Sequence, residues 1–145
     1  MLALIQRVTQ ASVAIDNTLV GVIQQGILGF IGIEKNDTEK QAEKLLDKLL
    51  RFRIFADSND KMNRSLQDIQ GGLLLVSQFT LVADTQAGTR PSFSTAMPPA
   101  ESEKLFGFLI EKAKALHPIV ANGVFGADMQ VSLCNDGPVT FLLKA

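Results

Sequence analysis

The chain has 145 residues, of which 46% are hydrophobic and 20% charged, and its formal net charge at pH 7 is −1. An intrinsically disordered protein has fewer apolar residues and more net charge, and a protein that grips nucleic acid over a broad surface is basic. Both classes are excluded, and any contact with RNA should be confined to one end of the molecule. A chain of this length can bury one substantial core, so we expect a single domain over residues 1–145.

The single cysteine, Cys134, excludes an internal disulfide and favours a reducing compartment. Residues 1–8 lack the basic start and apolar core of a signal peptide. No apolar run approaches the roughly 20 residues needed to cross a bilayer. We therefore expect a soluble, cytoplasmic protein with no membrane partner. Cys134 falls in an alternating strand pattern, which predicts a buried structural thiol.

The first third of the chain predicts strands joined by tight turns. Strands are expected over Leu2–Thr9, Ser12–Ile15 and Leu19–Ile23, with a turn at Asp16-Asn17. The run Gly26–Ile33 is apolar at successive positions, so both of its faces should be buried. This pattern is typical of a central strand, in which glycines allow another backbone to approach closely.

Two helices are predicted. Thr38 and Gln41 have the spacing of a capping box, and Pro99 suits the first turn of the second helix. The first helix should bury an apolar stripe made of Ala42, Leu45, Leu46, Leu49 and Leu50. The second should bury Leu105, Phe106, Leu109, Ile110, Ala113 and Leu116. Between the helices, Asp57–Lys61 is expected to be a loop.

The second half of the chain predicts three further strands, over Leu73–Leu81, Asp128–Cys134 and Val139–Leu143. In the second of these, Met129, Val131 and Leu133 alternate with polar residues, so one face should be buried. The segment Ala83–Pro99 has no periodicity, and connections of this length are usually functional or mobile. Strands and helices in this order predict an α+β fold, in which curved β-sheets form a half-barrel or sandwich with two main helices packed on it.

Two common kinds of site are not indicated. A metal site needs three or four His, Cys, Asp or Glu ligands in a cluster, and the chain has one His and one Cys. Neither a Gly-x-Gly-x-x-Gly motif nor a phosphate-binding loop is present. We therefore expect no metal and no cofactor. His117 precedes Pro118 at the end of the second helix, where we expect a partly exposed cation without a catalytic role.

Two polar segments interrupt otherwise bland strand sequence: Ser77-Gln78-Phe79-Thr80-Leu81 and Asn135-Asp136-Gly137-Pro138-Val139-Thr140. They hold no His, no Cys and no paired carboxylates, so an enzyme built on them works with backbone groups and neutral side chains. Taken alone, the first could be a strand end with exposed hydroxyls. The second could be a plain hairpin turn, and Arg7 could be an ordinary charge on an edge strand.

Taken together, these segments resemble the D-aminoacyl-tRNA deacylase family, also called D-tyrosyl-tRNA deacylase, from end to end. The resemblance covers Ile5-Gln6-Arg7-Val8, Lys61-Met62-Asn63, Ser77–Leu81, Gly88–Phe93, Ala127–Val131 and Asn135–Thr140. It implies a hydrolase that removes D-amino acids, and some glycine, from the 3′-terminal adenosine of tRNA. It also implies a homodimer with its active sites at the subunit interface, and a cis peptide bond at Gly137-Pro138 that faces the partner subunit's pocket.

The resemblance also assigns roles to individual residues. Catalysis is assigned to the segment Ser77, Gln78, Phe79 and Thr80. Substrate binding and chiral selection are assigned to Arg7, Phe125, Met129, Asn135, Gly137 and Pro138. The Gly-Pro carbonyls would block an L side chain and let a D side chain or glycine pass, and Arg7 would hold their orientation.

An aminoacyl ester is already activated, and the tRNA supplies a 2′-hydroxyl beside it that can orient or deprotonate water. Backbone N–H groups around Phe79 and Thr80 would stabilise the oxyanion while Gln78 holds the substrate. Three alternatives stay open: covalent attack by Thr80, a chirality-selective binding module without turnover, and a related deacylase that acts on L-alanine with a trans Gly-Pro bond.

Overall fold

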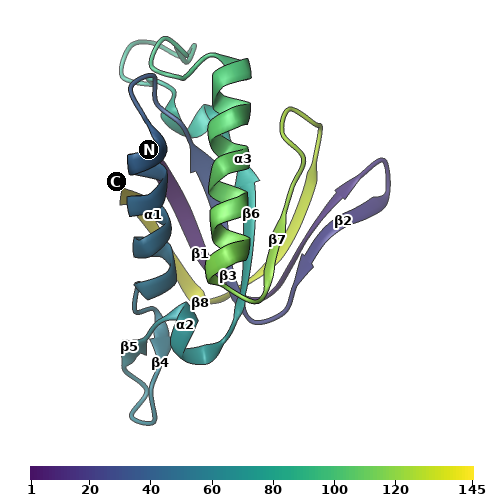
Figure 1. Ribbon diagram of the computed structural model, residues 1–145, viewed down its shortest axis with the longest axis vertical. Helices are drawn as coiled ribbons and strands as arrows, with labels where there is room; N and C mark the ends of the chain where they lie inside the picture. The colour runs from purple at the N-terminus through teal and green to yellow at the C-terminus, as the bar shows by residue number, and fades with distance from the viewer.

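The computed structural model describes residues 1–145 as a curved sheet with two long helices side by side on one face (Figure 1). These helices are α1 (Glu39–Arg51) and α3 (Pro99–Leu116). A short helix, α2 (Leu66–Ile69), and a turn of 3₁₀ helix, η1 (Phe79–Val82), lie between them in sequence. The predicted α+β class is confirmed. None of the helices is long and apolar enough to cross a membrane.

The main sheet has six strands, in the order β2-β1-β3-β6-β7, with β8 paired to β1 along the other edge of that strand. Their bounds are β1 (Leu2–Ile15), β2 (Thr18–Ile23), β3 (Gly26–Gly32), β6 (Gly72–Ser77), β7 (Val120–Asn122) and β8 (Gln130–Lys144). The β3–β6 and β6–β7 pairs are parallel and the others antiparallel. A separate hairpin pairs β4 (Phe55–Ala56) with β5 (Met62–Arg64) around the expected loop at 57–61.

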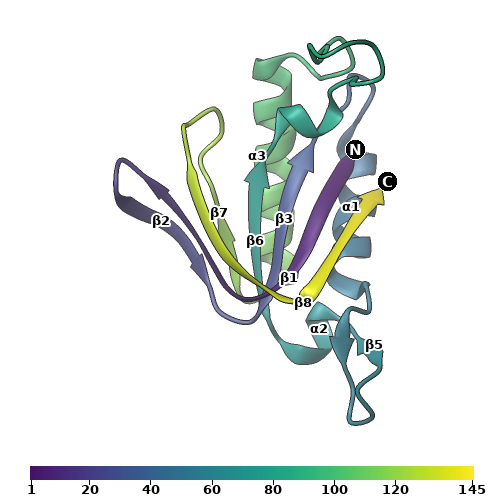
Figure 2. The ribbon, with the colours of Figure 1, turned by 180° about the vertical axis from the view of Figure 1, so that it is seen from behind.

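The long strands β1 and β8 bend together near their middles, so that the sheet has two arms (Figure 2). The pairing explains the bend. Gln6 lies opposite Thr140 and Val8 lies opposite Asn135, so Arg7 alone faces the four residues 136–139. Extra residues on one strand of a pair make a bulge that bends the strand and leaves those residues unpaired. The Gly-Pro segment is therefore a bulge that projects from β8.

Apolar side chains fill both sides of the central strands. A cluster of 22 buried residues lies between the helices and the sheet, and includes Ile27 and Ile31 of β3. A second cluster, of seven buried residues, lies on the opposite face and includes Leu28 of the same strand. The prediction that β3 is buried on both faces is confirmed. A free energy of about 25 cal/mol per Å² of buried apolar area makes these two clusters the main source of stability.

The helix predictions are largely confirmed. The Thr38 N–H donates to Gln41 Oε1 at 3.0 Å, as a capping box requires. The five stripe residues predicted for α1 are all buried, and Pro99 is the first residue of α3. Leu116 is the exception, because α3 ends at that residue and leaves its side chain 61% exposed.

Several strands were predicted with the wrong first or last residue. Residues 2–15 form one strand rather than two, and so do residues 130–144. The Asn-Asp-Gly-Pro sequence is therefore no hairpin turn, because both halves of β8 pair with the same strand in the same direction. Strand β6 ends at Ser77, where its pairing with β3 ends, and residues 79–82 turn into η1.

The burial predictions for two residues are also wrong. Cys134 is exposed, and so is Gln10, which lies opposite it on β1. In the same strand, Leu133 is 37% exposed rather than buried. His117 is only 3% exposed, and its Nε2 lies 2.6 Å from the Gly71 carbonyl oxygen. The ring turns inward after α3 and satisfies a carbonyl that would otherwise be buried without a partner.

Candidate active site

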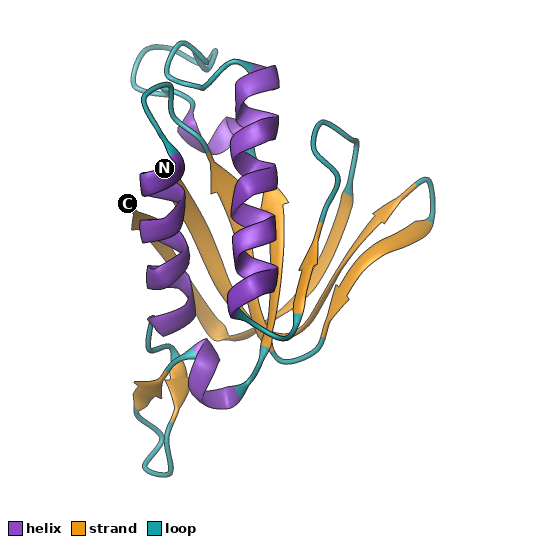
Figure 3. Cartoon of the chain, viewed as in Figure 1, coloured by secondary structure: helices purple, strands orange, loops and turns teal.

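The structure has a cavity of about 720 Å³ whose lining includes the first residues of α3. Loops gather at this end of the molecule, where α3 begins (Figure 3). Ligand sites in proteins commonly have volumes of about 300–1,000 Å³ and mostly apolar walls. The lining comes from the ends of β3 and β6, the starts of η1, α3 and β8, and two loops: Phe30, Ile31, Ile33, Val76, Ser77, Gln78, Phe79, Phe93, Ala96, Met97, Pro98, Pro99, Ser102, Phe125, Gly126, Ala127, Met129 and Val131. None of these side chains is ionisable, so the cavity offers neither a general acid nor a general base.

The first polar segment forms one edge of this cavity. The Gln78 N–H donates to the Ile31 carbonyl at 2.8 Å, which fixes the point where the chain leaves the sheet. Helix η1 then begins at Phe79. The first N–H groups of a helix have no acceptor within it, so those of Phe79 and Thr80 are available as donors. The Gln78 side-chain amide donates to the Thr80 hydroxyl, and so orients it.

The second polar segment lies at the bend of β1 and β8 and is held from two sides. The Arg7 Nε donates to the Asp136 carbonyl at 2.9 Å, and Nη1 donates to the Ile54 carbonyl at 2.6 Å. The Asn135 Oδ1 accepts the Val139 N–H at 2.6 Å. The Arg7 and Asn135 side chains thus fix the bulge on both sides of the Gly137–Pro138 bond, which is cis.

Only glycine suits position 137. Its φ of +143° lies in a region that L residues rarely adopt. A Cβ there would lie 2.7 Å from Val139 Cγ2 and 3.1 Å from Arg7 Nη2. Gly137 and Pro138 are nevertheless exposed to solvent. The bulge therefore presents bare backbone at the surface while its neighbours hold it in place.

The structure divides the ten predicted site residues into two groups. Five line the cavity: Ser77, Gln78, Phe79, Phe125 and Met129. Four form the bulge and its supports, and none of these lines the cavity: Arg7, Asn135, Gly137 and Pro138. Thr80 lies beside the cavity through its bond to Gln78. One chain therefore carries both groups without bringing them together.

Residue patterns alone did not identify Phe93, Met97 and Ser102 as lining residues. Two of them lie in the long segment 83–99, where the absence of any period gave no hint of which side chains face inward. Hydrogen bonds hold that segment against the sheet edge. The Lys35 N–H donates to Thr95 O at 3.0 Å, and the Met97 N–H donates to Ile33 O at 3.1 Å. The length of the segment was the available signal.

None of the ionisable groups with a perturbed pKa lines the cavity. Partial burial of Glu34 acts to raise its pKa. The hydrogen bonds and positive charges of the Met1 ammonium and Lys144 act in the opposite direction and are stronger, so the pKa of Glu34 is lower than its ordinary value. Hydrogen bonds from Asn63 and nearby backbone groups lower the pKa of Asp57 in the β4–β5 turn. No group of three or more His, Cys, Asp or Glu side chains is placed to hold a metal ion.

Known proteins resemble this chain over its whole length. A family described as D-Tyr-tRNA(Tyr) deacylase matches residues 4–144. A D-aminoacyl-tRNA deacylase of Cellvibrio japonicus (strain Ueda107) is 56% identical over 144 residues, which cover 99% of both chains. The protein of that name from Stutzerimonas stutzeri (strain A1501) is 58% identical over 145 residues and 100% of both chains.

Solved structures agree with this relationship. A c-Myc DNA Unwinding Element Binding Protein superimposes with a TM-score of 0.95 at 37% identity, covering 100% of this chain and 99% of the other. A probable eukaryotic D-amino acid tRNA deacylase has a TM-score of 0.87 at 15% identity, over 99% and 98% of the two chains, and this shows the fold alone. By sequence match and structure, the chain belongs to the D-Tyr-tRNA(Tyr) deacylase family.

Proposed function

We propose that this protein hydrolyses the ester bond of D-aminoacyl-tRNA, releasing the free D-amino acid and tRNA. One observation carries the proposal: a chain of this family has an apolar cavity free of ionisable side chains, edged by the backbone of Phe79 and Thr80. Such a site suits a substrate that is already activated and brings its own polar groups. The relatives' name, D-aminoacyl-tRNA deacylase, supports the same activity.

The proposed reaction is attack by water on the ester carbonyl. The 2′-hydroxyl of the terminal ribose orients the water and relays its proton, accepting it as the C–O bond forms while passing its own proton toward the ribose 3′-oxygen. The resulting oxyanion accepts hydrogen bonds from the N–H groups of Phe79 and Thr80, each worth about 3 kcal/mol in the transition state. Collapse of the intermediate breaks the bond to the ribose 3′-oxygen, which takes up the proton. Gln78 holds the substrate.

Handedness is proposed to be read by the backbone of Gly137 and Pro138. Their carbonyl groups would face the substrate's α-carbon, where an L side chain collides with them and a D side chain points away. Glycine, which has no side chain, would also pass. Exclusion by a fixed backbone needs no contact with the accepted side chain, so one site serves many D-amino acids. The bonds from Arg7 and Asn135 support this role, because a mobile bulge could not exclude anything.

The separation of the cavity from the bulge supports a homodimer in which each subunit's bulge completes its partner's cavity. The outer edge of β8 has no strand partner, and that strand exposes Leu133, Phe141 and Leu142. Long edges with exposed apolar side chains are usually covered in native proteins. A two-fold axis would build two identical composite sites, and cytoplasmic aminoacyl-tRNA would be the other partner.

The deciding experiment measures deacylation of tRNA charged with D-tyrosine or L-tyrosine by the purified protein. We expect multiple turnovers with the D form and none above background with the L form. Equal rates on both would overturn the chiral mechanism. Binding without turnover would identify a binding module instead. L-alanyl-tRNA is tested as a third substrate, and its selective hydrolysis would identify the related deacylase.

A further inference from the structure

Two aromatic rings lie exposed at the mouth of the cavity. Phe79 is 61% exposed and Phe93 is 41% exposed, although both also contribute to the lining. Their ring centroids are 5.0 Å apart, at an interplanar angle of 56°. One exposed apolar side chain is common on protein surfaces. Two in contact at a cavity mouth form a patch of the kind that marks a binding site.

Neither ring belongs to either hydrophobic core, so folding does not account for them. The backbone that carries each ring is nevertheless held in position. Asp84 and Ser92 exchange backbone hydrogen bonds of 2.8 and 2.9 Å just before Phe93, and the Ala96 N–H donates to the Phe93 carbonyl at 3.1 Å. Phe79 opens η1 directly after the fixed Gln78. Aromatic side chains carried on a fixed backbone lose little further conformational freedom when a flat ligand binds to them.

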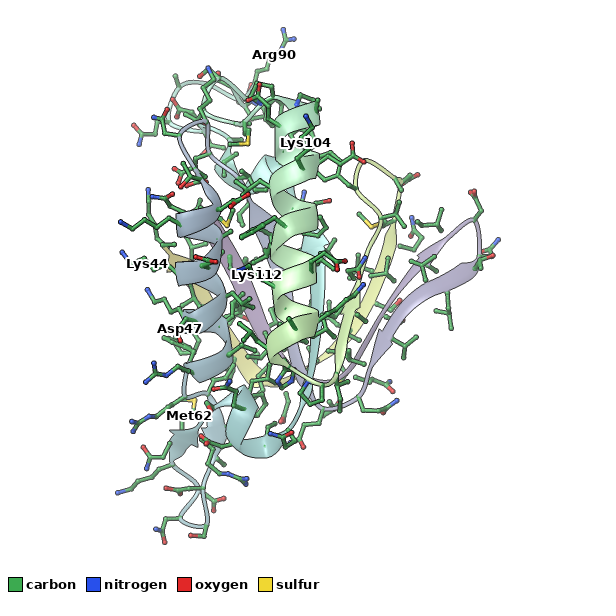
Figure 4. All side chains as sticks on the ribbon, viewed as in Figure 1. Lys44, Asp47, Met62, Arg90, Lys104 and Lys112 are labelled. Atoms are coloured by element: carbon green, nitrogen blue, oxygen red, sulfur yellow. The ribbon has the colours of Figure 1, made fainter.

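The proposed substrate supplies such a ligand. If the cavity takes the aminoacyl group and the terminal adenosine, the rest of the single-stranded 3′ end must leave across the mouth. Its first flat group outside is the base of the penultimate nucleotide. Arg90, three residues before Phe93, points away from the body at this same end of the molecule (Figure 4), within the exposed segment that a neighbouring phosphate would pass.

We propose that Phe79 and Phe93 form a stacking platform for the base that precedes the terminal adenosine of the substrate tRNA. This inference rests on the proposed function and adds to it a second nucleotide subsite. Stacking of a base on an aromatic side chain contributes about 1–3 kcal/mol and does not depend on base identity. The platform accordingly binds the 3′ end of every tRNA while leaving the choice of amino acid to the cavity.

The test uses three synthetic D-tyrosyl esters: adenosine, the dinucleotide cytidylyl-adenosine, and the same dinucleotide without its cytosine base. The last two carry the same phosphate, so their difference isolates the base. For the native protein, we expect kcat/KM on the intact dinucleotide to exceed that on the abasic one by about 5- to 150-fold, the range equivalent to 1–3 kcal/mol. For Phe93→Ala, this ratio should fall to about one.

Phe93→Tyr should restore the ratio, and Phe93→Leu, which keeps apolar bulk without an aromatic face, should restore little of it. Because each ratio compares two substrates on one variant, a general loss of folding or catalysis cancels.

Native protein that hydrolyses all three esters with equal kcat/KM on the two dinucleotides would overturn the platform and leave the proposed function intact. Inactivity on every D ester would overturn both. A Phe93→Ala protein that dissociates into monomers would show that a partner subunit covers the rings, and would also overturn the platform.

Discussion

Arg7 of β1 and Gly137 of β8 are fitted to one another across the bend of the sheet. The Arg7 guanidinium binds the carbonyl immediately before Gly137, at 2.9 Å, and its Nη2 would lie 3.1 Å from any Cβ at that glycine. The Asp136 carboxylate lies 3.5 Å from the same Nε and adds a charge interaction. The Arg7 guanidinium on β1, which is planar and makes several hydrogen bonds, therefore fixes the position of the exposed backbone at Gly137 on β8.

Replacing Arg7 by lysine should release the bulge while leaving the positive charge in place. Lysine is a point charge and cannot bond the Asp136 and Ile54 carbonyls in fixed directions, as the guanidinium does. We expect kcat/KM on D-tyrosyl-tRNA to fall about tenfold or more, and the ratio of D to L hydrolysis to fall with it. Arg53→Lys, at an exposed position directly before Ile54, is the control and should change neither. An unchanged ratio of D to L hydrolysis in the Arg7 variant would show that the position of the bulge does not determine chiral discrimination.

A methyl group at position 137 should be more damaging than one at another glycine with positive φ. Gly137→Ala meets both an unfavourable backbone angle and two close neighbours. Gly88→Ala meets only the angle, since nothing lies within 4 Å. We expect a loss of activity of about a hundredfold or more for the first and near-native kcat for the second. Rates and urea unfolding measured together would show whether the loss arises from the site or from stability. Undiminished activity of Gly137→Ala would contradict the proposed role of this backbone.

Removing the Thr80 hydroxyl should have little effect on the rate. That hydroxyl accepts a bond from Gln78 and has no base beside it, so Thr80→Ala should stay within about threefold of the native kcat. A substrate ending in 2′-deoxyadenosine should instead react about a hundredfold more slowly or worse, because it lacks the group proposed to activate water. Single-turnover measurements would check both. An inactive Thr80→Ala that still binds substrate would transfer the reaction to covalent catalysis by Thr80.

A composite site makes a specific prediction for mixed dimers. Met129→Arg should fill the cavity and Gly137→Val should spoil the bulge, so each variant alone should be inactive. Co-expressed with two different tags and purified as a mixed dimer, they should regain about half of the native rate per dimer, because one of the two sites receives an intact cavity and an intact bulge. If cavity and bulge served the same subunit, no activity would return.

Glu34 should stabilise the protein at neutral pH and cease to do so in acid. Its pKa in the folded protein lies below the ordinary 4.5, so its contribution is present above that value and is lost as the pH falls through the folded pKa. Glu34→Gln should lower the urea midpoint at pH 7 and converge with the native protein as the pH falls below the folded pKa of Glu34. Glu103→Gln, at an exposed residue of α3, should match the native protein throughout. A Glu34 difference that persists unchanged in acid would contradict the ionic origin of the effect.

Local sequence was sufficient where local physics decides the structure. The first helix could be predicted down to its cap and its five buried residues, since capping and a 3.6-residue period both act within a few turns. The burial of β3 on both faces followed from its composition alone. Both polar segments could likewise be selected as candidates from the sequence and the resemblance.

The features that could not be predicted from local sequence depend on contacts between segments that are distant in the chain. Asn-Asp-Gly-Pro has the chemistry of a turn, and only the pairing of residues on both sides with β1 makes it a bulge. The burial of Cys134 and His117 was predicted wrongly for a similar reason, because it depends on residues far away in the chain: Gln10, which lies opposite Cys134, and Gly71, whose carbonyl contacts His117. Phe93 lines the cavity because tertiary hydrogen bonds position its segment, and such bonds produce no periodic pattern in the sequence.

Because four residues of β8 face Arg7 alone, the length of this bulge is tied to the register of the whole C-terminal half of β8. Adding or deleting one residue there would rotate each later side chain to the other face. Leu143, now buried against Ala3, would turn toward solvent, and a neighbour such as Lys144 would turn inward. Evolution can therefore change the residues that surround this loop far more freely than it can change the number of them.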